Sequence, residues 1–174
     1  MTNLMEIAFF AAGAVAVIAT VLAITRLVAV HALLYLIVSL LAVAVVFYTM
    51  GAPLVAALEV IIYAGAIVVL FVFVVMMLNL GTAARETESQ WLAGRAWIVP
   101  VILSALLLAE MIYLIVRSPV PGDTSGVMAP KQVGLALYGP YLLGVELASM
   151  LLLGALVGAC HLGRTSPARS EVRK

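Results

Sequence analysis

Charged residues are scarce in this sequence. Of its 174 residues only 10% are charged, and the formal net charge is +1. Soluble domains carry about 25% charged residues, so the surface of an ordinary soluble domain is missing. A net charge this small offers no field that would attract a polyanion. These counts argue against a nucleic-acid-binding protein.

Cysteine is almost absent as well. The only one, Cys160, cannot form an internal disulfide, a CxxC redox pair, or a cysteine-ligated zinc or iron–sulfur site within the chain. A disulfide-stapled secreted module is therefore excluded. The sequence also has no Gly-rich phosphate loop, no nucleophilic triad and no pair of haem ligands. We expect no catalytic residue, no bound metal and no bound cofactor in this chain.

Apolar residues are abundant instead. They make up 66% of the chain, and the mean hydropathy is +1.27. A small domain buries only part of its surface, so it could not hide this many apolar side chains from water. The chain must be solvated by lipid, which rules out a soluble enzyme.

Five apolar runs are long enough to cross a bilayer, which requires about 20 residues each. We predict helices over residues 4–24, 28–50, 54–80, 97–116 and 138–162, in a membrane domain spanning 1–162. A polar tail follows at 163–174. Turn residues separate the runs, for example Gly51-Ala-Pro53 and Gly139-Pro140. Helices satisfy their own backbone hydrogen bonds in lipid, and these runs are too long for barrel strands. The predicted fold class is all-α.

Lys and Arg are unevenly divided between the two ends of the predicted helices. If the N-terminus lies outside, two basic residues fall on the outer side, Arg117 and Lys131. Seven then fall on the cytoplasmic side, namely Arg26, Arg85, Arg95, Arg164, Arg169, Arg173 and Lys174. By the positive-inside rule we predict an outside N-terminus and a cytoplasmic C-terminus.

Three acidic residues lie within the predicted spans: Glu59, Glu110 and Glu146. An ionised side chain is costly in the bilayer, so such residues usually face protein or water and often mark ion paths. Distances along each helix place all three about 9–11 Å inside the outer boundary. They could form one shared polar layer that holds or exchanges protons. The alternative is that each acid bonds separately to a polar group of a partner subunit.

The third span combines an acid with small residues. Glu59 and Tyr63 are four residues apart and share a helical face. The patch Ala64-Gly65-Ala66 lies just beyond them and leaves the backbone thinly covered. Small residues allow close helix packing, and they also ease a local rearrangement such as a π-bulge. From the residues alone, packing is the preferred reading and a hinge is the alternative.

Two histidines, His31 and His161, lie near the inner ends of their spans. Neither has a carboxylate or thiol at the spacing of a metal site. We interpret both as polar residues of the membrane interface.

Three segments of the chain resemble a known protein family. Residues 31–40 (HALLYLIVSL), 57–81 (ALEVIIYAGAIVVLFVFVVMMLNLG) and 139–153 (GPYLLGVELASMLLL) closely resemble the J subunits of bacterial respiratory complex I. This complex is the proton-pumping NADH:quinone oxidoreductase, and the mitochondrial counterpart of the subunit is subunit 6. The resemblance extends from the first predicted helix to His161. It does not support a role for Glu110.

The resemblance implies a multi-pass subunit of the bacterial inner membrane. Its partners would be other membrane-arm subunits, especially K, H, A and N, and the lipid bilayer. It would not bind nucleic acid. NADH, FMN, iron–sulfur clusters and quinone would be bound by other subunits, so this one would be a non-catalytic part of the enzyme. In the family the third helix carries a π-bulge that can convert to a regular α-helix. The corresponding residues here lie within 63–69 and include Tyr63, Ala64, Gly65, Ala66 and Val69.

The resemblance therefore implies a coupling role. The third helix would link quinone reduction to proton translocation, with Glu59, Tyr63 and Glu146 along or beside a proton path. Two alternatives remain open at this point. The chain could be a structural scaffold of the same membrane arm, or a homologous subunit of a hydrogenase- or antiporter-type complex.

Overall fold

The structure is a computed structural model, and it describes residues 2–26, 28–77, 97–117 and 127–163. Within these residues every regular element is helical, which confirms the all-α fold class. The elements in chain order are α1 (Thr2–Thr25), α2 (Ala29–Thr49), α3 (Pro53–Leu58), the π-helix η1 (Glu59–Ile67), α4 (Val68–Met77), α6 (Ile98–Arg117), α7 (Pro130–Leu137) and α8 (Leu142–Gly163).

Five helices in the described part of the chain are long and apolar enough to cross a membrane. They are Met5–Thr25, Ala29–Thr49, Pro53–Met77, Ile98–Val116 and Leu142–Gly163. The third of these spans is a continuous helix made of α3, η1 and α4. The five predicted spans are thus confirmed. The direction in which they cross the membrane stays a prediction.

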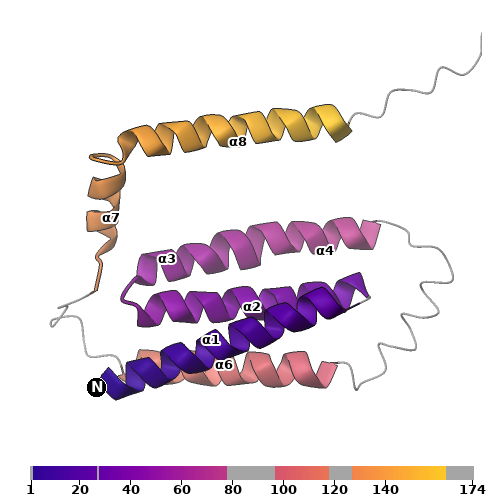
Figure 1. The fold of residues 1–174 in the computed structure, drawn as a ribbon, viewed down its shortest axis with the longest axis vertical. Helices are drawn as coiled ribbons and strands as arrows, with labels where there is room; N and C mark the ends of the chain where they lie inside the picture. The colour runs from indigo at the N-terminus through magenta and orange to yellow at the C-terminus, as the bar shows by residue number, and fades with distance from the viewer. Residues whose placement is uncertain (1, 27, 78–96, 118–126, 164–174) are drawn as a thin grey trace, which may run out of the picture. The chain divides into compact units, whose positions relative to one another are not determined.

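Residue contacts divide the chain into two units, Met1–Met128 and Ala129–Lys174. In the first unit α2 is the central helix, because it contacts α1, the third span and α6. Figure 1 shows the third span on one side of α2 and α6 on the other. The N-terminal unit is therefore built around α2.

Small side chains bring α1 and α2 close together. Ala8, Ala12, Val15 and Ala19 are buried at alternating spacings of four and three residues, so they form one stripe along α1. This stripe belongs to a cluster that also contains residues of α2 and α6, namely Val38, Ala42, Val45, Leu107 and Leu114. Lipid gives helices no hydrophobic reason to associate, so close van der Waals contact between small residues is a main source of their affinity.

A hydrogen bond between two hydroxyl groups reinforces this contact. The Oγ1 atom of Thr20 lies 2.7 Å from the Oγ atom of Ser39. The Ser39 hydroxyl is also placed to donate to the carbonyl of Ala16, at 3.1 Å. Polar groups that bond across helices in this way stabilise pairs of membrane helices.

The turn between α2 and α3 depends on Gly51. Its φ of 79° lies in the left-handed region, where a side chain would be strained. The N–H of Gly51 donates to the carbonyl of Tyr48, and the N–H of Ala52 donates to that of Phe47. This is the Schellman pattern that ends an α-helix. Pro53 then begins the next helix, where its missing N–H costs nothing.

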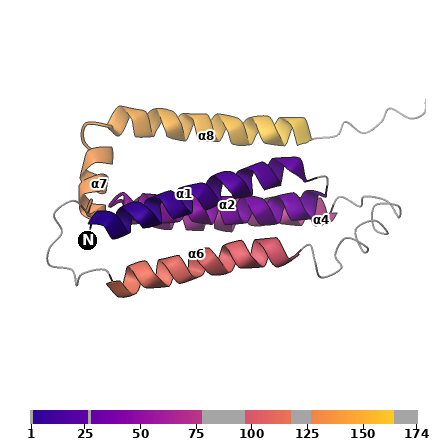
Figure 2. The same ribbon diagram turned by 60° about the horizontal axis from the view of Figure 1, so that its bottom comes forward.

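The second unit contains a short helix that the sequence analysis did not predict. Helix α7, drawn in Figure 2, begins at Pro130, between the predicted helices 97–116 and 138–162. The side chain of Gln132 accepts a hydrogen bond from the N–H of Ala129 and so caps its start. Eight residues are too few to give a clear apolar period, which explains why the helix was not recognised.

The last span begins four residues later than predicted, at Leu142 instead of residue 138. Residues Tyr138 to Tyr141 form a turn around Gly139-Pro140. A Cβ atom at position 139 would lie 2.7 Å from the carbonyl oxygen of Leu135, so only glycine fits there. The predicted residues 78–80 of the third span and 164–174 of the tail lie outside the described residues.

The α1–α2 contact gives a test of the fold. Ala12 is fully buried in it, whereas Ala11 is exposed. We expect Ala12→Leu to destabilise the detergent-solubilised protein by about 1–3 kcal/mol, because a larger side chain overpacks the contact. Ala11→Leu should have little effect. Circular dichroism melting curves would compare the two variants, and equal melting temperatures would contradict this packing.

Candidate functional site in the third membrane helix

The third span departs from regular α-helix in its first half. After the six residues of α3, the winding becomes π-helical from Glu59 to Ile67 and returns to α-helix at Val68. The N–H of Val68 donates to the carbonyl of Tyr63, five residues back instead of four. π-Helical segments are rare and are found frequently at functional sites. This segment is the most distinctive feature among the described residues.

The π-helix lies closer to the N-terminus than the resemblance implied. It contains Tyr63, Ala64, Gly65 and Ala66, but Val69 belongs to α4. The small-residue patch lies in the middle of the segment, which begins at Glu59 and ends at Ile67. The acid and the widened turn are one continuous segment.

Gly65 is adapted to the wider winding. A Cβ atom at this position would lie 3.1 Å from the carbonyl oxygen of Val60, which is an unusually tight contact. Val60 is five residues before Gly65, so this close approach is specific to the π-helical part of the span. The glycine lets the backbone adopt the wider turn without a clash.

The side chains of η1 are open to the surroundings of the chain. None of its residues is buried, and the Tyr63 side chain is 50% exposed. Glu59 is half-buried, and no hydrogen bond or ion pair to its carboxyl group occurs among the described residues. Glu59 and Tyr63 lie in the same π-helical segment but are not bonded to each other. A carboxyl group in this position can exchange protons with water or with a neighbouring protein.

Glu110 is placed differently, within the packed face of α6. Leu107 and Leu114, on either side of it along this face, are almost completely buried in the core of the first unit. The Oε1 atom of Glu110 is buried and has no hydrogen-bond partner within the described part of the chain. Residues Ile112 and Tyr113, on other faces of α6, are exposed. Glu110 is thus an internal acid of this unit.

Glu146 belongs to the second unit. Its side chain is exposed on α8, and its backbone carbonyl accepts a hydrogen bond from the hydroxyl of Ser149 at 2.8 Å. The described residues contain no group of three His, Cys, Asp or Glu side chains that could hold a metal ion. The shared layer of Glu59, Glu110 and Glu146 stays a prediction, since Glu146 lies in a separate unit.

His31 lies in the first turn of α2 and is buried against its own unit. Its side chain is only 6% exposed, and its Nε2 atom has no hydrogen-bond partner within the described segments. One pattern in the sequence indicates this burial, because His31, Tyr35 and Ser39 repeat every four residues along α2. This spacing puts them on one helical face, and all three are buried.

Five membrane spans, with acids inside them and a π-helical segment in the third, define a multi-pass α-helical membrane protein. Residues 6–162 match the family model described as NADH-ubiquinone/plastoquinone oxidoreductase chain 6. The chain belongs to this family.

Curated relatives cover almost the same length. The chain is 56% identical over 161 residues to NADH-quinone oxidoreductase subunit J of Pseudomonas aeruginosa, covering 92% of this chain and 97% of the relative. It is 54% identical over 160 residues to the protein of that name from Escherichia coli K12, covering 92% and 87%. A Buchnera aphidicola protein with this name is 48% identical over 160 residues, covering 92% and 98%.

The position of Glu110 leads to a stability prediction. We expect Glu110→Met to stabilise the detergent-solubilised protein by about 1–3 kcal/mol, because it removes a buried polar atom without a partner. Glu6→Met, at an exposed position of α1, is the matched control and should change stability little. Thermal unfolding followed by circular dichroism would measure both. A loss of stability in Glu110→Met would mean that the carboxyl group has a stabilising partner.

Proposed function

We propose that this chain is a membrane-arm subunit of a proton-pumping NADH:quinone oxidoreductase, in which it couples quinone reduction to proton translocation. The relatives are named as subunit J of NADH-quinone oxidoreductase, and they align over nearly their whole length. The observation that carries the coupling role is the π-helix at Glu59–Ile67, next to an acid inside a membrane span.

The proposed mechanism is a change of winding. Conversion of η1 to regular α-helix would shift each hydrogen bond from five residues back to four. Side chains on one side of the segment would then turn by about one helical position, roughly 100°, relative to the other side. The side chains of Tyr63 and Glu59 would then point in different directions relative to each other, while the ends of the helix stayed in place. A chain of water molecules beside Glu59 would form in one winding and break in the other.

The environment of the segment supports this mechanism. Only Ala56 and Val68 are buried in the whole third span, so few side chains of this chain lock its winding. In the π form, a Cβ atom at position 65 would lie very close to the carbonyl oxygen of Val60, and glycine avoids this contact because it has no Cβ atom. Both windings keep every N–H group of the turn paired, and the π form skips only one carbonyl, so both are tolerable in hydrocarbon.

Other parts of the complex would perform the remaining tasks. NADH, FMN, iron–sulfur clusters and quinone would be bound by other subunits, and this chain would be non-catalytic. Its direct neighbours would be the membrane subunits K, H, A and N. The complex would lie in the bacterial inner membrane with the N-terminus of this chain outside, as the distribution of Lys and Arg suggests. Glu146 would line the same proton path from α8.

A scaffold role is the second candidate. The observation that favours it is the exposure of apolar side chains along the third span and along α8, where no residue is buried. Exposed apolar helix faces suit contacts with neighbouring subunits as well as with lipid. In this role the acids would bond to partners and would carry no protons.

Gly65 provides the main test. We expect Gly65→Ala to favour the regular α-helix, because its Cβ atom would lie 3.1 Å from the Val60 carbonyl oxygen in the π winding. A penalty of about 1 kcal/mol on the π form alters the ratio of the two windings about fivefold. Proton pumping in membrane vesicles, followed by a pH-sensitive dye, should fall several-fold, while NADH–ferricyanide reduction should stay normal.

The matched control is Gly13→Ala in α1, where an added Cβ atom would meet nothing within 4 Å. This variant should pump normally. Unchanged pumping in Gly65→Ala, with the complex fully assembled, would refute the switch.

Substitution of the acids separates coupling from scaffolding. An amide cannot exchange protons, so Glu59→Gln and Glu146→Gln should each slow pumping in complexes that assemble fully. Glu6→Gln, near the start of α1, is the control and should pump normally. Native gel electrophoresis would report assembly. Normal pumping in both acid variants would favour the scaffold role.

A further inference from the structure

We propose that α7 lies flat on the lipid at one face of the membrane, with its apolar side among the headgroups and upper acyl chains and its polar side toward water. Both ends of the helix are fixed at the level where membrane spans begin or end, and the helix runs crosswise to α8. The inference depends neither on the winding of the third span nor on the proposed coupling role.

The start of α7 lies at a membrane boundary. In a chain that crosses the bilayer five times, the turn between the second and third spans is on the same side as the connection between the last two spans. A hydrogen bond joins these two segments, because the N–H of Met128 donates to the carbonyl of Gly51 at 2.9 Å. Gly51 lies at the boundary, between the end of one span at Thr49 and the start of the next at Pro53. Only Ala129 separates Met128 from α7, so the helix begins at this level.

The end of α7 is held at the start of α8. The carbonyl of Ala136, near the end of α7, accepts hydrogen bonds from the N–H groups of Gly139 and Tyr141, at 3.4 and 3.1 Å. The corner is compact, because a Cβ atom at Gly139 would lie 2.7 Å from the carbonyl oxygen of Leu135. The last membrane span then begins at Leu142. Both ends of α7 are therefore at the same membrane boundary.

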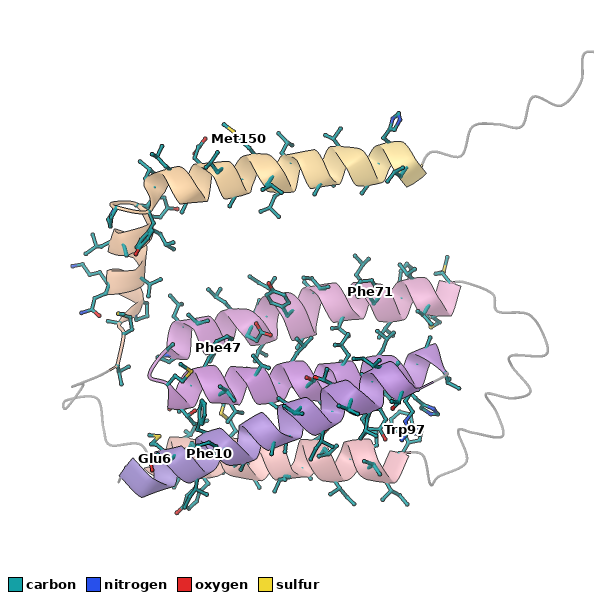
Figure 3. All side chains as sticks on the ribbon, viewed as in Figure 1. Glu6, Phe10, Phe47, Phe71, Trp97 and Met150 are labelled. Carbon is teal, nitrogen blue, oxygen red and sulfur yellow. The ribbon has the colours of Figure 1, made fainter. Side chains whose placement is uncertain are left out.

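The direction of α7 agrees with this placement. Figure 1 and Figure 2 show α8 lengthwise, and in both views α7 runs crosswise to it. No residue of α8 is buried, and side chains such as Met150 project from it into the surroundings (Figure 3), as expected of a span enclosed by lipid and other proteins. Because α8 crosses the bilayer, a helix crosswise to it lies in the plane of the membrane.

The residues of α7 suit the boundary between lipid and water. Pro130, Val133 and Leu137 share one side of the helix, and Lys131 and Gln132 lie on the other side. Both polar side chains are exposed. A helix with one apolar and one polar side binds in the interface plane, with its apolar side about 5–10 Å deep at the edge of the acyl chains. The lysine stem can follow the lipid surface while its ammonium group reaches water or a phosphate.

Two tyrosines lie at the same level, in the turn between α7 and α8. Tyr138 is 76% exposed and Tyr141 is 66% exposed. Tyrosine is enriched at membrane–water interfaces, because its ring suits lipid while its hydroxyl group reaches water. Leu135 is the exception in α7, since it is exposed on the polar side. Single exposed apolar residues of this kind are normal on protein surfaces.

The small size of α7 favours lipid over a protein partner. Eight residues make a helix about 12 Å long and about 10 Å wide, so one side covers about 120 Å². A specific protein interface needs roughly 800 Å² on each partner. Lipid sets no such minimum, and the lipid contact of α8 continues directly onto α7.

Fluorescence quenching in the intact complex tests this position. The complex is placed in nanodiscs with the fluorescent amino acid Anap in place of Val133, Leu137 or Gln132. Phosphatidylcholine brominated in its upper acyl chain quenches fluorophores in lipid, and iodide quenches those in water. We expect the brominated lipid to quench positions 133 and 137 equally, and each about twofold more than position 132. Iodide should quench position 132 most.

Three results would overturn the proposal. Weaker quenching by brominated lipid at position 133 than at position 137 would mean that α7 rises from the membrane, because position 133 is one turn farther from α8. Quenching of both positions by iodide alone would place water at the apolar side. Quenching by neither agent would place protein there.

The corner between α7 and α8 gives a second test. Gly139→Ala forces a Cβ atom against the Leu135 carbonyl, so the corner must open. Quenching of the fluorophore at position 137 by brominated lipid should then fall about twofold. Gly134→Ala is the matched control within α7, because an added Cβ atom would meet nothing within 4 Å. Equal quenching in the two variants, in complexes that native gels show to be fully assembled, would contradict a helix held on the lipid by this corner.

Discussion

The bilayer interior offers no water to hydrogen-bond the backbone, and the rest of this structure follows from that constraint. Each span must pair its own N–H and C=O groups, so all regular structure among the described residues is helical. A π-helical segment comes close to meeting the same requirement, because every N–H group still pairs with a carbonyl one residue farther back and only one carbonyl is skipped where the α-helix resumes. The third span can therefore depart from α-helix inside the membrane at modest cost. An interruption that left several backbone groups unpaired would cost far more.

Packing within the chain divides the spans into fixed and less restrained parts. Helices α1 and α2 are held by a stripe of alanines and by the hydrogen bond between Thr20 and Ser39. The third span contacts α2, yet most of its residues stay exposed and only Ala56 and Val68 are buried. A helix that is held so lightly by its own chain keeps the freedom to change its winding. This freedom is what the proposed coupling role requires, and the partner subunits would complete its surroundings.

For the three acids in the membrane spans, residue spacing predicts the position along each helix but not the surroundings of the side chain. Spacing placed Glu59, Glu110 and Glu146 inside membrane spans, and the helices found in the structure contain all three. It could not distinguish Glu110, whose Oε1 atom is buried against the core of its own unit, from Glu59, which is half-buried, or Glu146, which is exposed. That difference depends on which face of each helix meets another helix. In membrane spans that are apolar all round, the sequence alone does not mark this face.

Hydrophobic length and long motifs are local properties of the chain, so the fold class, the five spans and the family could all be inferred from the sequence alone. It also indicated the small-residue patch around Gly65. Where the π-helix begins and ends became apparent only in the structure, because it depends on which carbonyl each N–H group of the span selects. The depth of burial of His31 also needed the structure. It arises from the way separate helices pack, which the spacing of residues along one helix indicates only in part.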